Sequence, residues 1–472
     1  MTSSTHKMNN NVQASPSKHF FVSMLTRDID LKDSILDLLD NCVDGILRQL
    51  KNSDVQDTEE PYLSYWARII ITPEEFSITD NCGGISKETA LNSAFRLGRK
   101  DDAQDKDIAT VGMYGIGMKR AMFKMGEYSK VISFEANDSY YVEITPEWLK
   151  NDDLWTLDLI DAEADLEEHG TKILVKQLYE NIKDQFDSTK SNFIDDLIDE
   201  ISNFYALILK KGFKVYVNSK EIEAKPLDIL FPNNFDSGTI TPYLYVGDTD
   251  NVSIKIMVGF YRQLASEIEI EDEKQIPRSR DNAGWTIICN DRVILYRDKT
   301  QITGWGDGDV PKYHNQFIAI AGVVIFYSNE PLKLPINTTK RGIDMQTPVY
   351  WQARKYMKQG LKKFTDFTNY WKGQEEETKP KFTNTNPSSV NKAIASIPND
   401  MWKQVRGETS SKYFVPELPR PSTENVRRRI SFLRTLEDVE LLGEFYFDNQ
   451  RAEPSEIGAR CFDEAIKKAQ EN

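Results

Sequence analysis

The sequence predicts an α+β protein, with a first domain of mixed helices and strands, a strand-rich second domain and a small carboxyl-terminal segment. Residues 31–50 carry apolar side chains at intervals of three and four, which is typical of an amphipathic helix. Residues 67–79 contain two strand-like runs on either side of T-P-E-E, which is typical of a β-hairpin. Strand-like runs in the second domain lie at residues 253–258, 285–289, 292–296 and 317–326.

The remaining elements follow in chain order. Between the hairpin and the end of the first domain, the patterns indicate helices at residues 115–124 and 193–209 and strands at 130–134, 140–144, 169–175 and 214–217. A long helix with one apolar stripe is predicted at residues 349–371. The predicted parts are a disordered tail (1–18), a first domain (19–225), a second domain (226–372), a linker (373–395) and a partner-docking segment (396–472) with helical patterns at 424–444 and 454–470.

Composition narrows the function classes. The formal net charge of -15 argues against a large nucleic-acid surface but leaves room for a local basic patch. The four cysteines form no C-x-x-C pair, so neither a disulfide framework nor a zinc module is expected, and the four histidines supply little metal or Ser-His-Asp chemistry. The longest apolar run, residues 317–327, is short of the roughly 20 residues that a membrane helix needs. We therefore expect a cytoplasmic protein that does not enter a membrane.

The first informative motif is D-L-L-D-N-C-V-D-G, residues 37–45. On the predicted helix Asp37, Asn41 and Asp44 share one face, so they can converge on one ligand. An amide oxygen such as that of Asn41 suits magnesium, and Asp37, one turn earlier, can hold or deprotonate a water molecule. Asp40 either joins this group or points to solvent. The alternative is an ordinary amphipathic helix with a solvated acidic face.

The second motif is D-N-C-G-G-I, residues 80–85, at the end of a predicted strand. There the Asp80 carboxylate can accept a hydrogen bond from the amino group of adenine, and Gly83 and Gly84 let a ring lie close to the backbone. The alternative is a plain Asn-Gly type of turn.

The third motif is V-G-M-Y-G-I-G-M-K, residues 111–119. Its glycines, Gly112, Gly115 and Gly117, would let backbone N–H groups approach phosphate oxygens, and Lys119 can neutralise phosphate charge. It lacks the G-K-[ST] ending of a Walker A loop, and no clear strand precedes it as in a dinucleotide fingerprint. The alternative is a tight turn that leads into a helix.

In order and spacing, these three segments resemble the N, G1 and G2 boxes of the GHKL ATPases, the superfamily of gyrase, heat-shock chaperone, histidine kinase and MutL. The run His169-Gly170-Thr171 resembles the fourth box. The resemblance covers residues 20–225 and implies the Bergerat fold, an α/β sandwich with the nucleotide between helices and a mixed sheet. It also implies that Asn41 binds magnesium, that Asp80 reads adenine with support from Thr171, and that residues 96–110 form an ATP lid.

The chain departs from this superfamily at one position. The catalytic base there is usually glutamate, whereas this chain has Asp37, which is one methylene shorter. We therefore expect ATP binding, with hydrolysis that is slow or relies on a bridging water.

Residues 288–298 and 335–344 resemble the transducer domain of MORC-type and gyrase-type ATPases, in which a loop lysine reaches the γ-phosphate of ATP. Lys340 is the matching position, Lys333 is the competitor, and the alternative is a surface lysine. Histidine kinases lack this second domain, which disfavours a signalling kinase. The resemblance implies an ATP-dependent homodimeric clamp.

Its client is expected to be DNA or a DNA-associated partner. Arg354, Lys358 and Lys362, and residues 427–429, are basic clusters, which are expected more often on a solvated face than on a nucleic-acid surface. Two alternatives stay open, a chaperone-like clamp on protein clients and a nucleotide-gated scaffold with little turnover.

Overall fold

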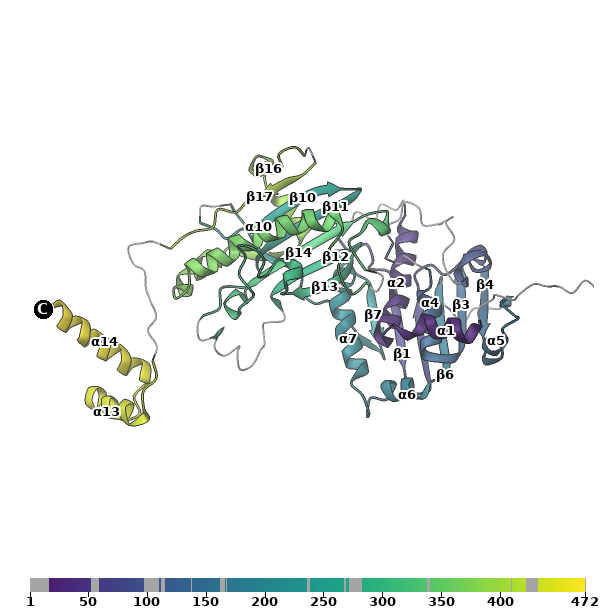
Figure 1. Ribbon diagram of the computed structural model, residues 1–472, viewed down its shortest axis with the longest axis horizontal. Helices are drawn as coiled ribbons and strands as arrows, with labels where there is room; N and C mark the ends of the chain where they lie inside the picture. The colour runs from purple at the N-terminus through teal and green to yellow at the C-terminus, as the bar shows by residue number, and fades with distance from the viewer. Residues whose placement is uncertain are drawn as a thin grey trace, which may run out of the picture. The chain divides into compact units, whose positions relative to one another are not determined.

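The computed structural model confirms the α+β class: two large sheets are each packed against helices (Figure 1). It describes residues 17–51, 59–96, 110–111, 115–136, 138–161, 166, 168–235, 238–266, 269–270, 282–337, 340–408, 410–421 and 432–471. Contacts divide the chain into two compact units, Met1–Arg420 and Pro421–Asn472, which are described separately.

The first domain is built on an eight-stranded sheet in the order β5-β4-β3-β6-β2-β1-β7-β8. Its strands are β1 (Trp66–Ile71), β2 (Glu75–Asp80), β3 (Gly126–Glu135), β4 (Asp138–Ile144), β5 (Leu159–Asp161), β6 (Gly170–Leu178), β7 (Lys214–Val217) and β8 (Lys220–Glu221). The predicted hairpin is confirmed, because β1 and β2 pair antiparallel. Strand β2 also pairs with β6, and this register sets Asp80 opposite Thr171.

Helices cover one face of this sheet (Figure 1). They are α1 (Lys18–Arg27), α2 (Leu31–Leu50), α3 (Lys87–Thr89) with a π-turn (Ala90–Ala94), α4 (Gly117–Met125), α5 (Pro146–Lys150), α6 (Glu180–Phe186), α7 (Phe193–Phe204) and α8 (Ala206–Lys210). Asp30 caps α2 by accepting from the Lys32 N–H at 2.8 Å. Burial alternates along β1, with Ile69 and Ile71 inside and Ile70 exposed, so the second face of this strand is open to solvent.

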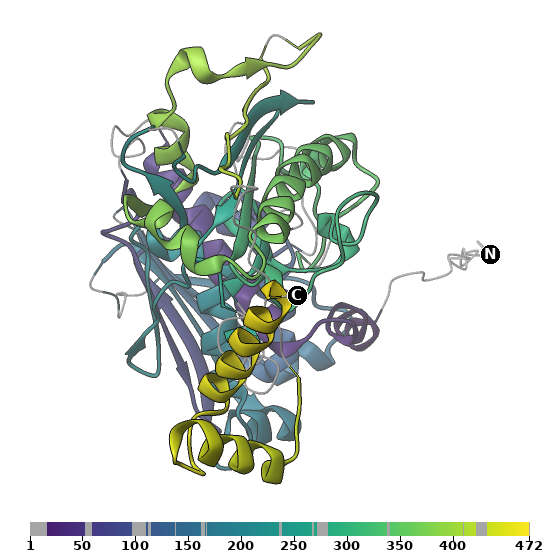
Figure 2. The ribbon, with the colours of Figure 1, turned by 90° about the vertical axis from the view of Figure 1, so that its left-hand side faces the viewer.

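The second domain is built on a seven-stranded sheet in the order β13-β12-β14-β11-β10-β17-β16. Its strands are β10 (Tyr243–Thr249), β11 (Val252–Phe260), β12 (Gly284–Cys289), β13 (Arg292–Asp298), β14 (Ile320–Tyr327), β16 (Lys403–Gln404) and β17 (Lys412–Phe414). Helix α10 (Pro348–Tyr370) packs on one face (Figures 1 and 2). On the other face pack α12 (Val390–Ser396) and β9 (Ile229–Pro232). The central strands are therefore buried on both sides.

Residues 373–395 differ from the predicted linker. They hold a 3-10 turn (Glu375–Thr378), α11 (Lys379–Phe382), β15 (Thr385–Ser388) paired with β9, and the start of α12. The Pro, Ser, Thr and Asn content suggested a loop, but Phe382 and Val390 are buried and fix this segment to the sheet. The domain boundaries drawn from the sequence otherwise stay predictions.

The second unit contains α13 (Leu436–Phe447) and α14 (Pro454–Gln470), which are joined by the Tyr446 hydroxyl bond to Glu464 at 2.9 Å. The helix predicted at 454–470 is confirmed, whereas α13 lies further along the chain than the predicted 424–444, of which residues 422–431 are outside the described residues. Among the described residues, no helix combines the length and the apolar character of a membrane span. The tail prediction falls almost wholly outside them, since only Ser17 and Lys18 of that range are described.

Candidate functional site

Asp80 ends strand β2 as a buried acceptor. Its carboxylate accepts from the Cys82 N–H at 2.8 Å and from the Cys42 thiol at 3.5 Å, and the Thr171 N–H also donates to it. Burial raises the pKa of Asp80 to about 6, although these hydrogen bonds oppose the rise. Burial likewise raises the pKa of the Cys82 thiol to about 11. The predicted pair Asp80 and Thr171 is thus brought together in one place.

The close packing of the backbone around Gly84 requires a glycine at this position. Gly84 has a φ of +74°, and a Cβ there would lie 2.4 Å from the Phe134 carbonyl oxygen. A side chain at this position would therefore push β2 and its loop away from β3. This close approach is between two backbone segments, whereas the sequence suggested approach by a ring.

The predicted phosphate loop is only partly described. Gly112 lies outside the described residues, Gly115 is exposed with a φ of +66°, and Gly117 begins α4. Lys119, on the first turn of α4, is buried and donates to the carbonyl oxygens of Gly115 and, at 2.8 Å, Ala94. Burial lowers the pKa of Lys119 to about 8. Its ammonium therefore ties the start of α4 to the π-turn after α3.

The end of the predicted lid is held from two sides, although residues 97–109 of the lid lie outside the described residues. Asp44 on α2 accepts from the Val111 N–H at 2.6 Å. From the second domain, the Asn290 side chain donates to the Thr110 carbonyl oxygen at 3.1 Å. The segment that links lid and phosphate loop thus contacts both domains.

Asp37 is engaged by two cations. One carboxylate oxygen accepts from Arg120 on α4, and the other lies 3.2 Å from the Lys340 ammonium. A Cβ built on Gly117 would lie 3.1 Å from the Asp37 Cβ, so α2 and α4 are close here. Asn41, one turn along α2, is exposed and lies outside this charge cluster.

Asp40 is the centre of a buried charge network. It is 1% exposed, and its carboxylate contacts Lys340 at 2.6 Å, Arg292 at 3.0 Å and the Tyr205 hydroxyl. Burial alone would raise the pKa of Asp40, but Lys340 and Arg292 outweigh it and hold the pKa below its usual value. For Lys340, burial lowers the pKa, and the carboxylates of Asp40 and Asp37 reverse this and raise it.

The neighbour of Lys340 strengthens the same contact between domains. Arg341 pairs with Asp33 on α2 and with Glu200 on α7, and its guanidinium lies 4.4 Å from the centre of the Phe204 ring. Lys340 itself has a φ of +56°, which a non-glycine residue adopts at a cost. The contacts of both side chains hold Lys340 in this conformation.

Sequence reasoning missed Arg120, Tyr205 and Arg292, and it left Asp40 undecided. Arg292 lies within the segment 288–298 that was singled out, and Asp40 precedes Asn41, so both were next to a signal. Tyr205 lies inside the predicted helix 193–209, which the structure breaks at this residue into α7 and α8. Lys333, the competitor of Lys340, pairs with Asp250 and Glu330 instead.

The basic side chains predicted on α10 form ion pairs with nearby carboxylates. Arg354 and Lys358 both pair with Asp307 at 2.9 Å, and Lys362 pairs with Asp366 at 2.5 Å. Residues 427–429 are outside the described residues. These ion pairs favour the solvated-face interpretation of α10.

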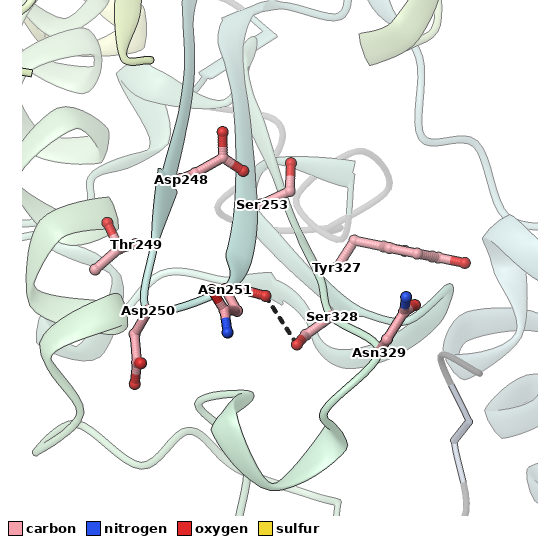
Figure 3. Close-up of a pocket in the computed structure, with 8 residues that line it drawn as sticks. All are labelled: Asp248, Thr249, Asp250, Asn251, Ser253, Tyr327, Ser328 and Asn329. Atoms are coloured by element: carbon pink, nitrogen blue, oxygen red, sulfur yellow. Dashed lines mark hydrogen bonds between the residues drawn. The ribbon is translucent and has the colours of Figure 1, made fainter. Parts of the chain in front are cut away.

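A polar pocket lies in the second domain, beside the turn between β10 and β11 (Figure 3). The Ser328 hydroxyl donates to the Asn251 carbonyl oxygen at 3.0 Å within it. It is lined by Asp248, Thr249, Asp250, Asn251, Ser253, Tyr327, Ser328 and Asn329. None of the predicted site residues is among them.

A comparison with known families matches the segment that holds Asp37, Asp80 and Thr171. Residues 29–173 match the model of the histidine kinase-, DNA gyrase B- and HSP90-like ATPases. This match supports a GHKL-type ATPase domain here, and ATP binding and hydrolysis in general. No curated protein matches the chain.

Proposed function

We propose that the chain is a magnesium-dependent ATPase that acts as a dimerising clamp, with a layout similar to MORC-type proteins. One observation carries the proposal: Lys340 of the second domain contacts Asp40 and Asp37 on helix α2 of the first domain. A loop lysine that reaches the predicted catalytic carboxylate is suitably located to sense a γ-phosphate.

The adenine end of the proposed site is Asp80, supported by Thr171. A buried carboxylate that is already oriented by backbone N–H groups can bind the adenine amino group with little rearrangement. Gly115 and Gly117, together with Gly112, are proposed to receive the phosphates, and Lys119 to pair with them once it leaves the Gly115 and Ala94 carbonyls.

Asn41 is proposed to hold the magnesium ion. Its amide is exposed on α2 one turn from Asp37, and a single neutral oxygen ligand fits an ion that keeps most of its waters. Bound magnesium would neutralise charge on the ATP phosphates. Asp37 would then hold the attacking water, which requires it to release at least one of its two cations.

Lys340 provides the link between nucleotide and domain angle. A γ-phosphate carries more negative charge than one carboxylate, so it can draw the Lys340 ammonium away from Asp37. The ion pair between Lys340 and Asp40 would remain. The proposed client of the resulting clamp is DNA or a DNA-associated partner. DNA binding that weakens as salt is raised would support this client, whereas a lack of DNA binding would favour a chaperone-like clamp on proteins.

A nucleotide-gated scaffold with little turnover is the second candidate, and the state of Asp37 favours it. Both oxygens of this short side chain are engaged, by Arg120 and by Lys340, which leaves it poorly placed as a base. Replacing Asp37→Asn separates the two functions, because an ATPase loses turnover whereas a scaffold keeps the same low rate.

Sizing chromatography with light scattering tests the clamp. With magnesium and a non-hydrolysable ATP analogue, we expect the monomer to become a dimer, whereas ADP leaves it monomeric. Lys340→Met should abolish this difference, and Lys333→Met should preserve it. An analogue that binds without any change in mass would contradict the clamp.

A further inference from the structure

Two cysteine thiols flank the Asp80 carboxylate. Cys42 lies on α2, directly after Asn41, and Cys82 lies in the loop that follows β2. All three side chains are buried: Cys42 is 4% exposed, Cys82 is 3% exposed and Asp80 is 9% exposed. Their ligand atoms, two sulfurs and one carboxylate oxygen, all lie within 4.8 Å of one another. Three side chains of types that bind metal ions thus meet at one buried point.

The spacing suits a tetrahedral site. The Cys42 sulfur lies 3.5 Å from the Asp80 oxygen. In a tetrahedral zinc site, bonds of about 2.3 Å to sulfur and about 2.1 Å to oxygen put neighbouring sulfur and oxygen ligands about 3.6 Å apart. An ion could therefore replace the thiol protons with little movement of the side chains.

We propose that Cys42, Cys82 and Asp80 bind one zinc-class divalent cation, with water in the fourth position. Binding is a ligand exchange without oxidation: two metal–sulfur bonds and one metal–oxygen bond form, and the two thiol protons leave to solvent. Two thiolates and a carboxylate select a soft ion such as Zn²⁺ or Cd²⁺ over magnesium.

A metal ion at this site would also affect the proposed binding of ATP. A cation on Asp80 occupies the carboxylate that is proposed to accept the adenine amino group, so metal and nucleotide would exclude each other. This consequence rests on the proposed function, whereas the metal site itself does not. Sequence spacing hides the site, because Cys42 and Cys82 are 40 residues apart and form no C-x-x-C pair.

The test is a Cd²⁺ titration of the reduced, metal-free full chain, followed by sulfur-to-cadmium charge-transfer absorbance in the ultraviolet. We expect saturation at one ion per chain. Cys42→Ser, Cys82→Ser and Asp80→Asn should each weaken binding by at least about 10- to 100-fold, the loss that even outer-shell changes cause. Cys289→Ser and Cys461→Ser are the controls and should leave the titration unchanged.

Two results would overturn the site: no charge-transfer band in the folded chain, or an affinity for Cd²⁺ that is unchanged in both Cys42→Ser and Cys82→Ser. Circular dichroism shows that each variant is folded, and Asp80→Asn keeps both thiols in case a serine variant does not fold.

Nucleotide binding by Cd²⁺-loaded, desalted protein tests the consequence separately. We expect the affinity for ATP to fall at least tenfold and to return after EDTA treatment, with Cys82→Ser insensitive to the ion. Saturable Cd²⁺ binding with unchanged ATP binding would leave the metal site standing and remove Asp80 as the adenine contact.

Discussion

The two ends of the candidate site are built in different ways. At the end with Asp80, the contacts from described residues come from the first domain, and neutral N–H and thiol groups surround one carboxylate. At the end with Asp37 and Asp40, charged side chains from α4 and from the second domain meet two carboxylates. The first end is preformed by one fold, whereas the second exists only while two domains are in contact.

This difference assigns separate tasks to the two ends. A preformed acceptor suits recognition, because it needs no movement. A charge cluster shared between domains suits switching, because any new anion competes for its cations. The predictions below test this division, from the largest expected effect to the smallest.

Removing Asp40 should cause the largest effect. Asp40→Ala leaves Arg292 buried without a carboxylate, which we expect to cost about 3–5 kcal/mol in the free energy of unfolding. Urea denaturation measures it. Asp307→Ala is the matched control, because Asp307 also pairs with two cations but is partly solvated, and it should cost less than about 1 kcal/mol. Equal costs would contradict the buried network.

Lys340→Met should lower ATP turnover by about 100-fold, the usual loss when one donor to a transition-state anion is removed. ADP lacks the γ-phosphate, so its affinity should stay within a factor of two. Steady-state kinetics and calorimetry measure the two effects. The control is Lys333→Met, whose lysine pairs only with Asp250 and Glu330 among the described residues. A parallel loss of ADP binding would assign Lys340 to the fold instead.

Asp80→Asn should weaken ATP binding by about 10- to 100-fold, because a hydrogen bond to a charged acceptor contributes about 1.5–3 kcal/mol. Isothermal calorimetry with magnesium measures it. The unfolding free energy should change far less than in Asp40→Ala, since the described hydrogen-bond partners of Asp80 are uncharged N–H and thiol groups. ATP affinity within threefold of the parent would remove Asp80 from the site.

The smallest expected effect is a pH dependence of ATP affinity through Lys119. Burial lowers its pKa to about 8, so the amine is charged well below this pH and loses its charge as pH rises through 8. Phosphate raises that pKa, so binding takes up a proton, and affinity should fall by at most about tenfold per pH unit above 8. Lys119→Arg should flatten the profile in calorimetry between pH 7 and 9. A slope that persists in this variant would come from another group.

More of the end with Asp80 than of the end with Asp37 and Asp40 could be predicted from the sequence. Residues 31–50 and 67–79 have local periodicity, which was enough to predict helix α2, the hairpin and the position of Asp80 at a strand end. The burial of Asp40 could not be read locally, because Tyr205, Arg292 and Lys340 lie 165, 252 and 300 residues further along the chain. The polar composition of residues 373–395 suggested a linker, but a few buried apolar side chains there fix the segment to the sheet.

Helix α10 starts a few residues after Lys340 and runs for 23 residues. Its length is about 35 Å, so a tilt of about 5° at the Lys340 end would displace the far end by about 3 Å. Because α10 packs against a sheet whose central strands are buried on both faces, a tilt at the Lys340 end would move helix and sheet together as one rigid lever arm. A small shift of one ammonium group could thus become a movement large enough to open or close a contact on the opposite side of the domain.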